Sequence, residues 1–387
     1  MSEAEGWGHY PPAAEAHWVN CAEAVTGLVG DDALERLAPA VARLSDLFTT
    51  ERPEGRFPDY FADEELRAAY GVFFLPQSFV RTGFALAQAM ELRRWRPTSP
   101  TPAILDLGAG PGSCGLSAAH HLHRLGAGHV EFVAVDRSPS ALAGLEGFAA
   151  ASLGPAVSVR TRVGDAARPE TWPDGDYDLI VAGFVLNEMT HLQSTEALAW
   201  FAQLKRRLRP GGLIVLLEPA PRATAERLQR LSEAICAQGL ITRIGPELDQ
   251  RPCPELLGAE HWNHESRPWT APRSTAYVNR RLFRDLREVR FACALFSDAS
   301  LTELPATAAR LVSDVQIIKG LLRFIVVREG ALQSVEVPTR GLSKHDIKGL
   351  AATFGRGDVV TFPRLPGPKI RLGERSDLVV HWSPGRP

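Results

Sequence analysis

The segment "ILDLGAGPGSCG", residues 104–115, constrains the fold of this 387-residue chain more than any other. It begins as an apolar strand that ends at Asp106, and Gly108, Gly110 and Gly112 then open a turn before a helical sequence. Glycines at these positions let the backbone approach a ligand, and the start of the following helix offers N–H groups without partners. The segment therefore predicts a ligand-binding turn between a strand and a helix, a pattern that dinucleotide-binding enzymes share.

Apolar strands alternate with helical stretches through the middle of the chain. The strands are apolar over almost their whole length, which is typical of a parallel sheet that helices cover on both faces. This pattern predicts an α/β fold with a doubly wound, Rossmann-like sheet. The segments that we expect to form its strands are "AILDLGAG", "VEFVAVD", "VSVRTRVGD", "YDLIVAGFVL" and "GLIVLLEP".

Changes in composition divide the chain into three parts. Residues 1–98 carry apolar side chains at helical spacing, and a linker rich in proline follows them. Residues 99–300 contain the alternating strands and helices, with an insertion rich in Arg, Pro and Trp at about 220–275. Residues 301–387 combine alternating apolar residues with turn residues, which predicts a small antiparallel β-rich module.

The overall composition, with 45% hydrophobic and 23% charged residues, is that of a soluble globular protein. A net charge of -2 argues against nucleic-acid binding by bulk charge, although it leaves room for a local basic face. Five widely spaced cysteines do not form a disulfide framework, which favours a reducing compartment. The start lacks a secretory signal, and no apolar run approaches the roughly 18 residues that span a bilayer. We therefore expect a cytoplasmic protein with no membrane partner.

Three further features restrict the kinds of ligand that the glycine turn can bind. The second strand ends at Asp136, where a carboxylate can accept both hydroxyls of a ribose. The third strand is followed by Gly164 and Asp165, and this second carboxylate suits the amino group of an adenine. A Pro-Gly-Gly turn precedes the fifth strand. An NAD-binding domain gives no reason for the Gly-Asp pair and this turn to occur together.

This set of motifs, in this order, closely resembles the class I S-adenosylmethionine-dependent methyltransferases over roughly residues 103–220. In that family the D-x-G-x-G-x-G loop holds the methionine part of the cofactor, and the acids after the second and third strands hold ribose and adenine. The resemblance implies S-adenosyl-L-methionine as the cofactor and methyl transfer as the activity. It assigns the cofactor contacts to Asp106, Gly108, Ala109, Gly110, Gly112, Asp136, Gly164, Asp165 and Asn187.

The acceptor side in this family begins after the fourth strand, where this chain has Asn187 and Glu188. Methyl transfer from a sulfonium requires an acceptor that is in line with the methyl group, desolvated and sometimes deprotonated by a base. Asn187 and Glu188 are therefore candidate catalytic residues, because open α/β sheets place ligands at the carboxyl ends of their strands. Glu188 is a candidate base or orienting residue; the alternative is an acid that a helix N-terminus favours.

Segments outside the core resemble one branch of the superfamily, the methyltransferase-like proteins associated with the small ribosomal subunit in mitochondria and bacteria. "AAYGVFFLPQSF" is similar to their Ala-Tyr-x-x-x-Tyr-Leu-Pro segment, and "PCP" followed by "HWNH" is similar to their Pro-Cys-Pro-His and Trp-Cys-His segments. "GLSKHDIKGLAATFGRGDVV" resembles their closing module. The resemblance spans about residues 65–360 and implies the small ribosomal subunit or its RNA as partner, with a role in translation.

The chain departs from this branch at its metal site. In mitochondrial relatives four cysteines hold an iron–sulfur cluster, whereas here only Cys253 matches and Asn263 occupies the third position. One thiolate cannot hold such a cluster, so we expect no metal. A zinc site built from Cys236, Cys253, His261 and His264 is the alternative.

The segment around Cys253, "RPCPELLGAEHWNHESRPW", falls where class I enzymes carry substrate-side insertions. We expect it to be a lid over the cofactor cleft, held by its prolines and tryptophans. In that arrangement His261, His264 and Glu265 would face the acceptor, and His264 is a third candidate catalytic residue.

Three functions remain open on these grounds. One is a methyltransferase, or a methyltransferase-like factor, that acts on the small ribosomal subunit or its RNA. The basic sequence "NRRLFRDLREVR" would contact phosphates if it forms one helical stripe, and it is otherwise a solvated face that pairs with Asp285 and Glu288. The second is a methyltransferase for a small molecule or a peptide. The third is a non-catalytic assembly protein that keeps the cofactor as a structural element.

Overall fold

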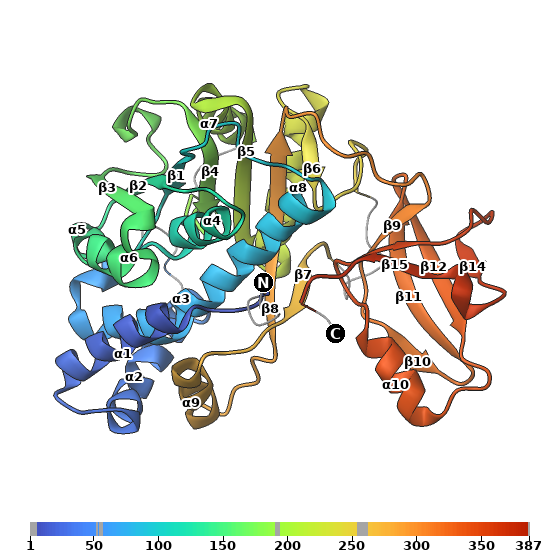
Figure 1. Cartoon of the computed structure of the whole chain (residues 1–387), viewed down its shortest axis with the longest axis horizontal. Helices are drawn as coiled ribbons and strands as arrows, with labels where there is room; N and C mark the ends of the chain where they lie inside the picture. Colours follow the sequence, from blue (N-terminus) through green and yellow to red (C-terminus); the bar gives the residue numbers. More distant parts are fainter. Residues whose placement is uncertain (1–5, 52, 54–56, 190–193, 254–261, 386–387) are drawn as a thin grey trace.

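The computed structural model describes residues 6–51, 53, 57–189, 194–253 and 262–385. Its core is an eight-stranded sheet with the order β3-β2-β1-β4-β5-β8-β6, and β7 pairs with β8 beside this path (Figure 1). In the part of the sheet that runs from β3 through β2, β1 and β4 to β5, each strand is parallel to its neighbours. The bounds are β1 (Ala103–Leu107), β2 (Val130–Asp136), β3 (Val157–Val163), β4 (Tyr177–Gly183), β5 (Leu208–Pro219), β6 (Arg243–Gly245), β7 (Glu265–Pro268) and β8 (Glu288–Ser297).

The predicted doubly wound α/β sheet is confirmed, with two departures from the expected strands. The central strands β1 and β4 are buried along their whole length, as their apolar sequences predict. The edge strand β3 is largely exposed, so the prediction of strands covered throughout is wrong there. The second departure is β8, which lies between β5 and β6 and runs antiparallel to both.

The order of the strands fixes where a ligand can bind. The chain winds from β1 to β2 and β3 in one direction and then from β4 to β5 in the other. Parallel sheets of this kind have a crevice outside the carboxyl ends of the two strands where the direction changes. Here these strands are β1 and β4, which pair directly. The loops after Leu107 and Gly183 therefore meet at one edge of the sheet.

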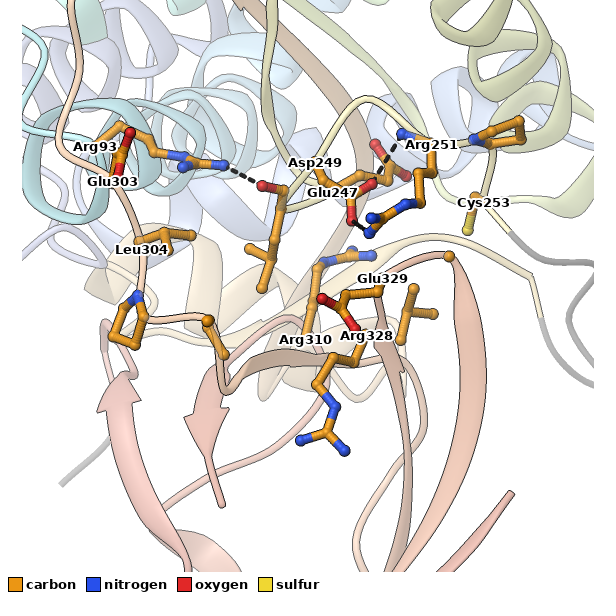
Figure 2. A pocket seen from close by; sticks show the side chains of 17 residues that line it. Arg93, Glu247, Asp249, Arg251, Cys253, Glu303, Leu304, Arg310, Arg328 and Glu329 are labelled. Atoms are coloured by element: carbon orange, nitrogen blue, oxygen red, sulfur yellow. Dashed lines mark hydrogen bonds and ion pairs between the residues drawn. The ribbon is translucent and has the colours of Figure 1, made fainter. Parts of the chain in front are cut away.

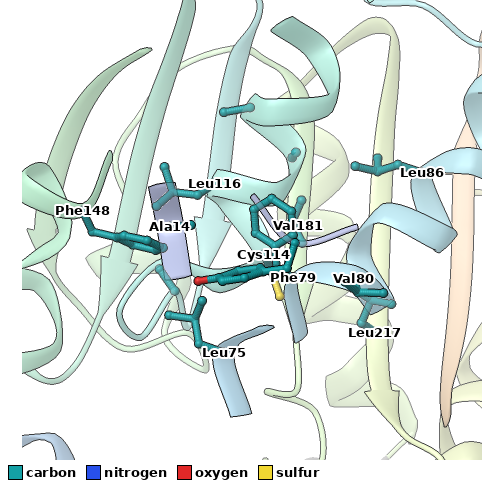
Figure 3. Close-up of a cluster of buried hydrophobic side chains, with 14 of the residues drawn as sticks. Ala14, Leu75, Phe79, Val80, Leu86, Cys114, Leu116, Phe148, Val181 and Leu217 are labelled. Atoms are coloured by element: carbon teal, nitrogen blue, oxygen red, sulfur yellow. The ribbon is translucent and has the colours of Figure 1, made fainter. Parts of the chain in front are cut away.

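Helices cover both faces of the sheet. On one face α1 (Pro12–Thr26), α2 (Asp31–Phe48) and α3 (Glu64–Ala87) share a single apolar core with β1 and with α4 (Ser113–Arg124). Figure 3 shows Leu75, Phe79 and Val80 of α3 among Leu116, Val181 and Leu217 of the central domain. The other face packs on α7 (Ser194–Arg206) and α8 (Arg222–Ala237). The N-terminal helices thus form one wall of the α/β domain.

Shorter helices complete the chain up to β8. They are η1 (Tyr60–Ala62), η2 (Gln88–Leu92), α5 (Pro139–Ala143), α6 (Leu145–Leu153), η3 (Gly154–Ala156), η4 (Pro169–Thr171) and α9 (Arg273–Arg281). The long helix α3 begins at a capped N-terminus, because the side chain of Asp63 accepts the backbone N–H groups of Glu65 and Leu66. No helix among the described residues is long and apolar enough to cross a membrane.

The C-terminal part of the chain folds around an apolar core of its own. Its seven-stranded sheet has the order β14-β12-β11-β9-β13-β15, with β10 paired to β11. Most of the pairs are antiparallel, as the sequence predicts, whereas β12 and β14 are parallel. The elements are β9 (Ala308–Leu311), β10 (Gln316–Ile318), β11 (Leu321–Arg328), β12 (Ala331–Pro338), α10 (Lys344–Ala352), β13 (Val359–Thr361), β14 (Lys369–Arg371), η5 (Arg375–Asp377) and β15 (Val379–Trp382).

The basic sequence "NRRLFRDLREVR" does not form one helical stripe. Helix α9 ends at Arg281, and Phe283 follows in the left-handed region with a φ of 53°. Arg287 then pairs with Asp285, and Arg290 pairs with Glu288 at the start of β8. Arg281 pairs instead with Glu35 of α2, and Arg284 lies over the ring of Phe73. The helical-stripe hypothesis is therefore wrong, whereas the expected pairing with Asp285 and Glu288 is confirmed.

Candidate cofactor site

The glycine turn after β1 has the conformation that its sequence predicts. Gly108, Gly110 and Gly112 all lie in the left-handed region, with φ values of 70°, 53° and 94°. Two of these positions are also crowded: a Cβ on Gly108 would lie 2.1 Å from Cγ1 of Val185, and one on Gly112 would lie 2.0 Å from Cδ1 of Leu145. Only glycine fits both the backbone and the space.

The turn is tied to the second strand by hydrogen bonds. The backbone N–H groups of Gly108 and Ala109 donate to the carbonyl of Val135, and Gly110 donates to Oδ2 of Asp136 at 2.8 Å. The other carboxylate oxygen of Asp136 accepts the N–H of Ser138 at 2.8 Å. Each oxygen keeps a second lone pair for a ligand hydroxyl. Burial raises the pKa of Asp136.

The end of β3 completes this edge of the site. Gly164 donates its N–H to the carbonyl of Asp136 at 2.9 Å, which joins the second and third strand ends. Oδ1 of Asp165 accepts the N–H of Ala167 at 2.9 Å, and the indole of Trp172 donates to the carbonyl of Asp165. The structure therefore brings Asp136, Gly164 and Asp165 together beside the glycine turn, as expected of a nucleoside site.

Asp106, at the end of β1, is buried beneath the turn with 1% of its surface exposed. Its Oδ2 accepts the N–H of Gly115 at 2.7 Å, whereas Oδ1 has no hydrogen-bond partner among the described residues. Burial raises the pKa of this carboxyl to about 7. A buried acceptor without a donor is costly for the protein alone. It fits a ligand that brings an ammonium group to the turn.

The loop after β4 carries Asn187 and Glu188, and a buried acid orients it. Glu218, near the end of β5, accepts the N–H groups of Leu186 at 2.9 Å and Asn187 at 3.0 Å. Burial raises the pKa of Glu218 to about 8, although these two N–H groups oppose the rise. Sequence reasoning missed Glu218. Its signal was present, since an acid inside the apolar strand "GLIVLLEP" requires buried partners.

Glu188 belongs to a turn beside the nucleoside side of the site, so the alternative of a helix N-terminus does not apply. Oε2 of Glu188 lies 3.3 Å from Nη2 of Arg137, the residue that follows Asp136. The same nitrogen of Arg137 donates to the carbonyl of Phe57 at 2.9 Å. One arginine therefore connects the β2 end, the β4 loop and the N-terminal region.

Residues of the N-terminal region, and not of the insertion, lie over Gly110 in the described part of the chain. The ring of Phe61 lies beside Gly110, where a Cβ would be 3.4 Å from Cζ. Tyr60 interacts electrostatically with both Asp136 and Glu188, and its own ring packs at 4.3 Å from that of Phe61. These two aromatic residues form a cap that shields the turn from water.

The insertion meets the C-terminal module instead. Glu265 is 3% exposed and accepts from Arg310 at 2.6 Å and from Arg267 at 2.8 Å, while Arg267 also pairs with Asp358. Although burial alone would raise it, the two arginines hold the pKa of Glu265 at about 2. We call Glu265, Arg267, Arg310 and Asp358 the junction network. Glu265 therefore cannot face an acceptor, and that part of the lid prediction is wrong.

The other residues predicted for the lid also lie near the junction. The indole of Trp262 donates to the carbonyl of Ala220, and the ring of His264 packs against this indole in a tilted arrangement with centroids 5.0 Å apart. His264 borders a small pocket with Glu247 and Arg310, and no contact joins it to Glu188 in the described chain. His261 lies outside the described residues.

Cys253 borders a cavity of about 330 Å³ between the insertion and the module (Figure 2). Figure 2 shows Arg251 and Cys253 across this cavity from Glu329. Burial raises the pKa of Cys253 to about 12, so its thiol is protonated at neutral pH. Asn263, in the place of the third cluster cysteine, hydrogen-bonds Glu247 and Arg310. Among the described residues no group of three or more His, Cys, Asp or Glu side chains is arranged to hold a metal.

Comparison with known proteins agrees with the fold. Residues 105–214 match a family model described as a methyltransferase domain. The strands of this segment have the doubly wound, Rossmann-like order of the class I methyltransferase fold. The chain is also 34% identical over 175 residues to a ribosomal protein L11 methyltransferase from Pelobacter propionicus, which covers 45% of this chain and 49% of that protein. The chain thus spans about half the length of this curated relative.

Solved structures with similar folds include two methyltransferases of low sequence identity. A class I S-adenosylmethionine-dependent methyltransferase from Listeria monocytogenes is 12% identical, with 76% of this chain and 89% of that chain covered and a TM-score of 0.37. A TehB-like methyltransferase from Corynebacterium glutamicum is 13% identical, with 68% and 98% covered and a TM-score of 0.33. The fold assignment rests on the family model and the sheet topology.

The residues of the methyltransferase domain fit S-adenosyl-L-methionine. The unmatched oxygen of Asp106 suits the ammonium of the methionine part, and the glycine turn leaves room for its chain. Asp136 and Asp165, on adjacent strand ends, suit ribose and adenine.

Proposed function

We propose that the protein is an S-adenosylmethionine-dependent methyltransferase. The observation that carries this proposal is the convergence of Asp106, Asp136 and Asp165 on one glycine turn whose backbone is bonded to the second acid. The match of residues 105–214 to a methyltransferase domain supports it. A bound S-adenosylmethionine supplies an electrophilic methyl group, so the protein has to bind, orient and desolvate the acceptor.

The acceptor end of the site is formed by the β4 loop and the aromatic cap. Glu218 holds the backbone of Leu186 and Asn187, which fixes the loop on which Glu188 stands. Glu188 then accepts the proton of an acceptor N–H or O–H as the new bond to carbon forms, and Arg137 orients its carboxylate. Tyr60 and Phe61 exclude water from the reacting atoms.

For the acceptor we propose a component of the ribosome, with the small subunit or its RNA as the first candidate. The segments that resemble small-subunit-associated proteins support this choice. The local similarity to a ribosomal protein L11 methyltransferase supports a ribosomal acceptor without favouring one subunit. The C-terminal module adds a basic face, since Arg323, Lys369 and Arg371 surround the single carboxylate of Glu336 and the last two are exposed. Such a face suits phosphate contacts.

Two measurements test the proposal. Titration calorimetry with S-adenosylhomocysteine should show one binding site, and NAD should show none. Incubation with cofactor that carries a labelled methyl group should label purified small ribosomal subunits. Large subunits and free ribosomal proteins are incubated in parallel as alternative acceptors. If a small-molecule or peptide fraction is labelled instead, the proposal of a ribosomal acceptor is wrong, whereas the proposal of methyltransferase activity holds.

The third reading, a non-catalytic cofactor-binding protein, makes a distinct forecast. It requires binding of S-adenosylhomocysteine without labelling of any fraction, and a Glu188→Gln variant would then behave like the unchanged protein in cells. A methyltransferase that uses Glu188 as base should lose about 10²–10⁴-fold in rate on this change.

A further inference from the structure

Arg81 stands in the C-terminal half of α3, where this helix of the N-terminal region faces the cofactor edge. Its guanidinium carbon lies 5.7 Å from the ring centroid of Phe184, the residue that follows β4. The strand end itself touches the start of α4, because a Cβ on Gly183 would lie 2.5 Å from Sγ of Cys114. Arg81 therefore lies at the crevice between β4 and the glycine turn.

The positive charge of Arg81 has no counter-charge in the described chain. Nη2 donates to the neutral amide of Gln77 at 3.3 Å, and Nε is buried without a hydrogen-bond partner. Of the carboxylates that the structure describes, none lies within ion-pair distance. The ionisable neighbours Tyr70 and Cys114 remain neutral at pH 7, since burial raises the pKa of both. A partly buried cation without an anion is costly to a protein, so its retention points to a ligand.

The backbone beside Arg81 is strained in a way that also indicates a binding site. Phe184 has a φ of 61°, which a non-glycine residue rarely adopts. The next residue, Val185, fills the space above Gly108. Strain of this kind persists where the surrounding structure imposes it and is concentrated at functional sites. Arg81 and Phe184 thus border the same turn as Asp106.

We propose that Arg81 binds the α-carboxylate of S-adenosylmethionine while Asp106 binds its α-ammonium. The two groups of this zwitterion are attached to one carbon, so their protein partners must face one small volume. Cys114 interacts electrostatically with both Arg81 and Asp106, so the unmatched cation and the unmatched anion both lie near its thiol. The planar fork of arginine matches a carboxylate with two parallel hydrogen bonds. This inference rests on the proposed cofactor and adds the N-terminal region to its site.

The test removes the carboxylate from the ligand as well as the arginine from the protein. Titration calorimetry compares S-adenosylhomocysteine with its decarboxylated analogue, 5′-deoxy-5′-(3-aminopropylthio)adenosine. The unchanged protein should bind S-adenosylhomocysteine more tightly. Arg81→Met should weaken binding of S-adenosylhomocysteine by about 10- to 100-fold, as the loss of a charge-assisted hydrogen bond predicts, and change the affinity for the analogue by less than about threefold.

Arg81→Lys and Arg36→Met are the control variants. Arg81→Lys keeps the charge without the fork and should lose less affinity for S-adenosylhomocysteine than Arg81→Met. Arg36→Met removes an exposed arginine that pairs with Glu65 and should leave both affinities unchanged. If Arg81→Met does not fold, as judged by its circular dichroism, the comparison of the two ligands is made on Arg81→Lys.

The outcomes separate this inference from the proposed function. Equal losses for the two ligands, or no loss for either, would overturn the role of Arg81 while the unchanged protein still binds S-adenosylhomocysteine. Failure of the unchanged protein to bind S-adenosylhomocysteine would overturn both.

Discussion

The cofactor edge and the junction network both gather acids and arginines, but they treat charge differently. In the junction network every carboxylate faces an arginine, and the side chains of Glu265, Arg267, Arg310 and Asp358 are no more than 4% exposed. At the cofactor edge the buried groups of Asp106 and Arg81 lack a partner of opposite charge in the described chain. The first region neutralises itself, whereas the second leaves charges that the proposed cofactor would match.

The comparison shows that an unmatched buried charge indicates a ligand better than a high density of reactive residue types. Cys253, Asn263 and His264 belong to a segment whose Cys and His content suggests a metal site or a lid, yet their neighbours satisfy them. The glycine turn contains only one acid, and that acid keeps a free oxygen.

Breaking the junction network should have the largest effect on stability. In Arg267→Met the carboxylates of Glu265 and Asp358 lose a buried partner, so we expect the free energy of unfolding to fall by about 3–5 kcal/mol. Urea denaturation measures this change. Arg287→Met, which breaks an exposed pair, should have a much smaller effect.

The affinity of the folded Arg267→Met variant for S-adenosylhomocysteine should remain that of the unchanged protein. If affinity falls by more than the unfolded fraction of the variant explains, the junction network also shapes the cofactor edge. The separation of the two regions would then be wrong.

Crowding the glycine turn should have the next largest effect, and it should affect binding. Alanine at position 108 meets Val185 and adopts a left-handed backbone, which costs about 1–2 kcal/mol before the clash is counted. We expect Gly108→Ala to lose at least about tenfold in affinity for S-adenosylhomocysteine, the equivalent of about 1.4 kcal/mol.

Gly147→Ala is the matched control for the turn. Gly147 lies within α6, and a Cβ there would meet nothing within 4 Å. This variant should bind normally and unfold at a slightly higher temperature, since alanine favours the helix. Equal affinities for Gly108→Ala and Gly147→Ala would contradict the assignment of the turn to the cofactor.

Much of the cofactor edge could be predicted from the sequence because it depends on local signals. The strands that carry it are short apolar runs, and the acids and glycines follow them at fixed offsets. The edge strand β3 departs from the pattern because only one side of it is paired, so its arginines remain in water. The antiparallel position of β8 requires knowledge of its partner, which local spacing does not contain.

The junction network could not be predicted, because its partners are distant in sequence. Glu265 meets Arg310 only after two units have folded against each other. The basic stripe failed for a different reason: spacing by three and four residues suits a helix, but no glycine or proline marks where α9 ends. For Glu218 the sequence contains half of the information. An acid within an apolar strand indicates that buried partners exist, but the sequence does not identify them as the backbone of the β4 loop.

The stability of the protein without cofactor should depend on pH through the buried carboxyl of Asp106. Burial raises the pKa of Asp106 to about 7, so the folded protein without cofactor retains a proton that the unfolded chain loses near pH 4. Its contribution to stability is therefore complete below pH 4 and is lost as the pH rises through 7. Between pH 5 and 8 the unchanged protein should lose about 1–3 kcal/mol of stability relative to Asp106→Asn.

Binding of the cofactor should depend on pH in the opposite direction. The ammonium group requires the ionised carboxylate of Asp106, so affinity for S-adenosylhomocysteine should rise by up to about tenfold per pH unit as the pH approaches 7 from below. Asp106→Asn should bind weakly with little pH dependence. A flat profile in the unchanged protein would mean that Asp106 does not meet the ammonium.

The smallest effect is expected at His264, and it tests the boundary between the two regions. Burial lowers the pKa of His264 to about 4, so the ring is neutral at pH 7. It packs against the ring of Trp262 and hydrogen-bonds the carbonyl of the same residue. His264→Ala should therefore cost about 1 kcal/mol or less, the value of one ring contact. Affinity for S-adenosylhomocysteine and methyl transfer to the acceptor should stay within about twofold of the values for the unchanged protein. The reason is that the charges of the junction network are paired within the network and do not depend on the cofactor edge. A loss of methyl transfer beyond tenfold with normal cofactor binding would contradict this separation and would make His264 a residue of the acceptor site, as the sequence alone suggests.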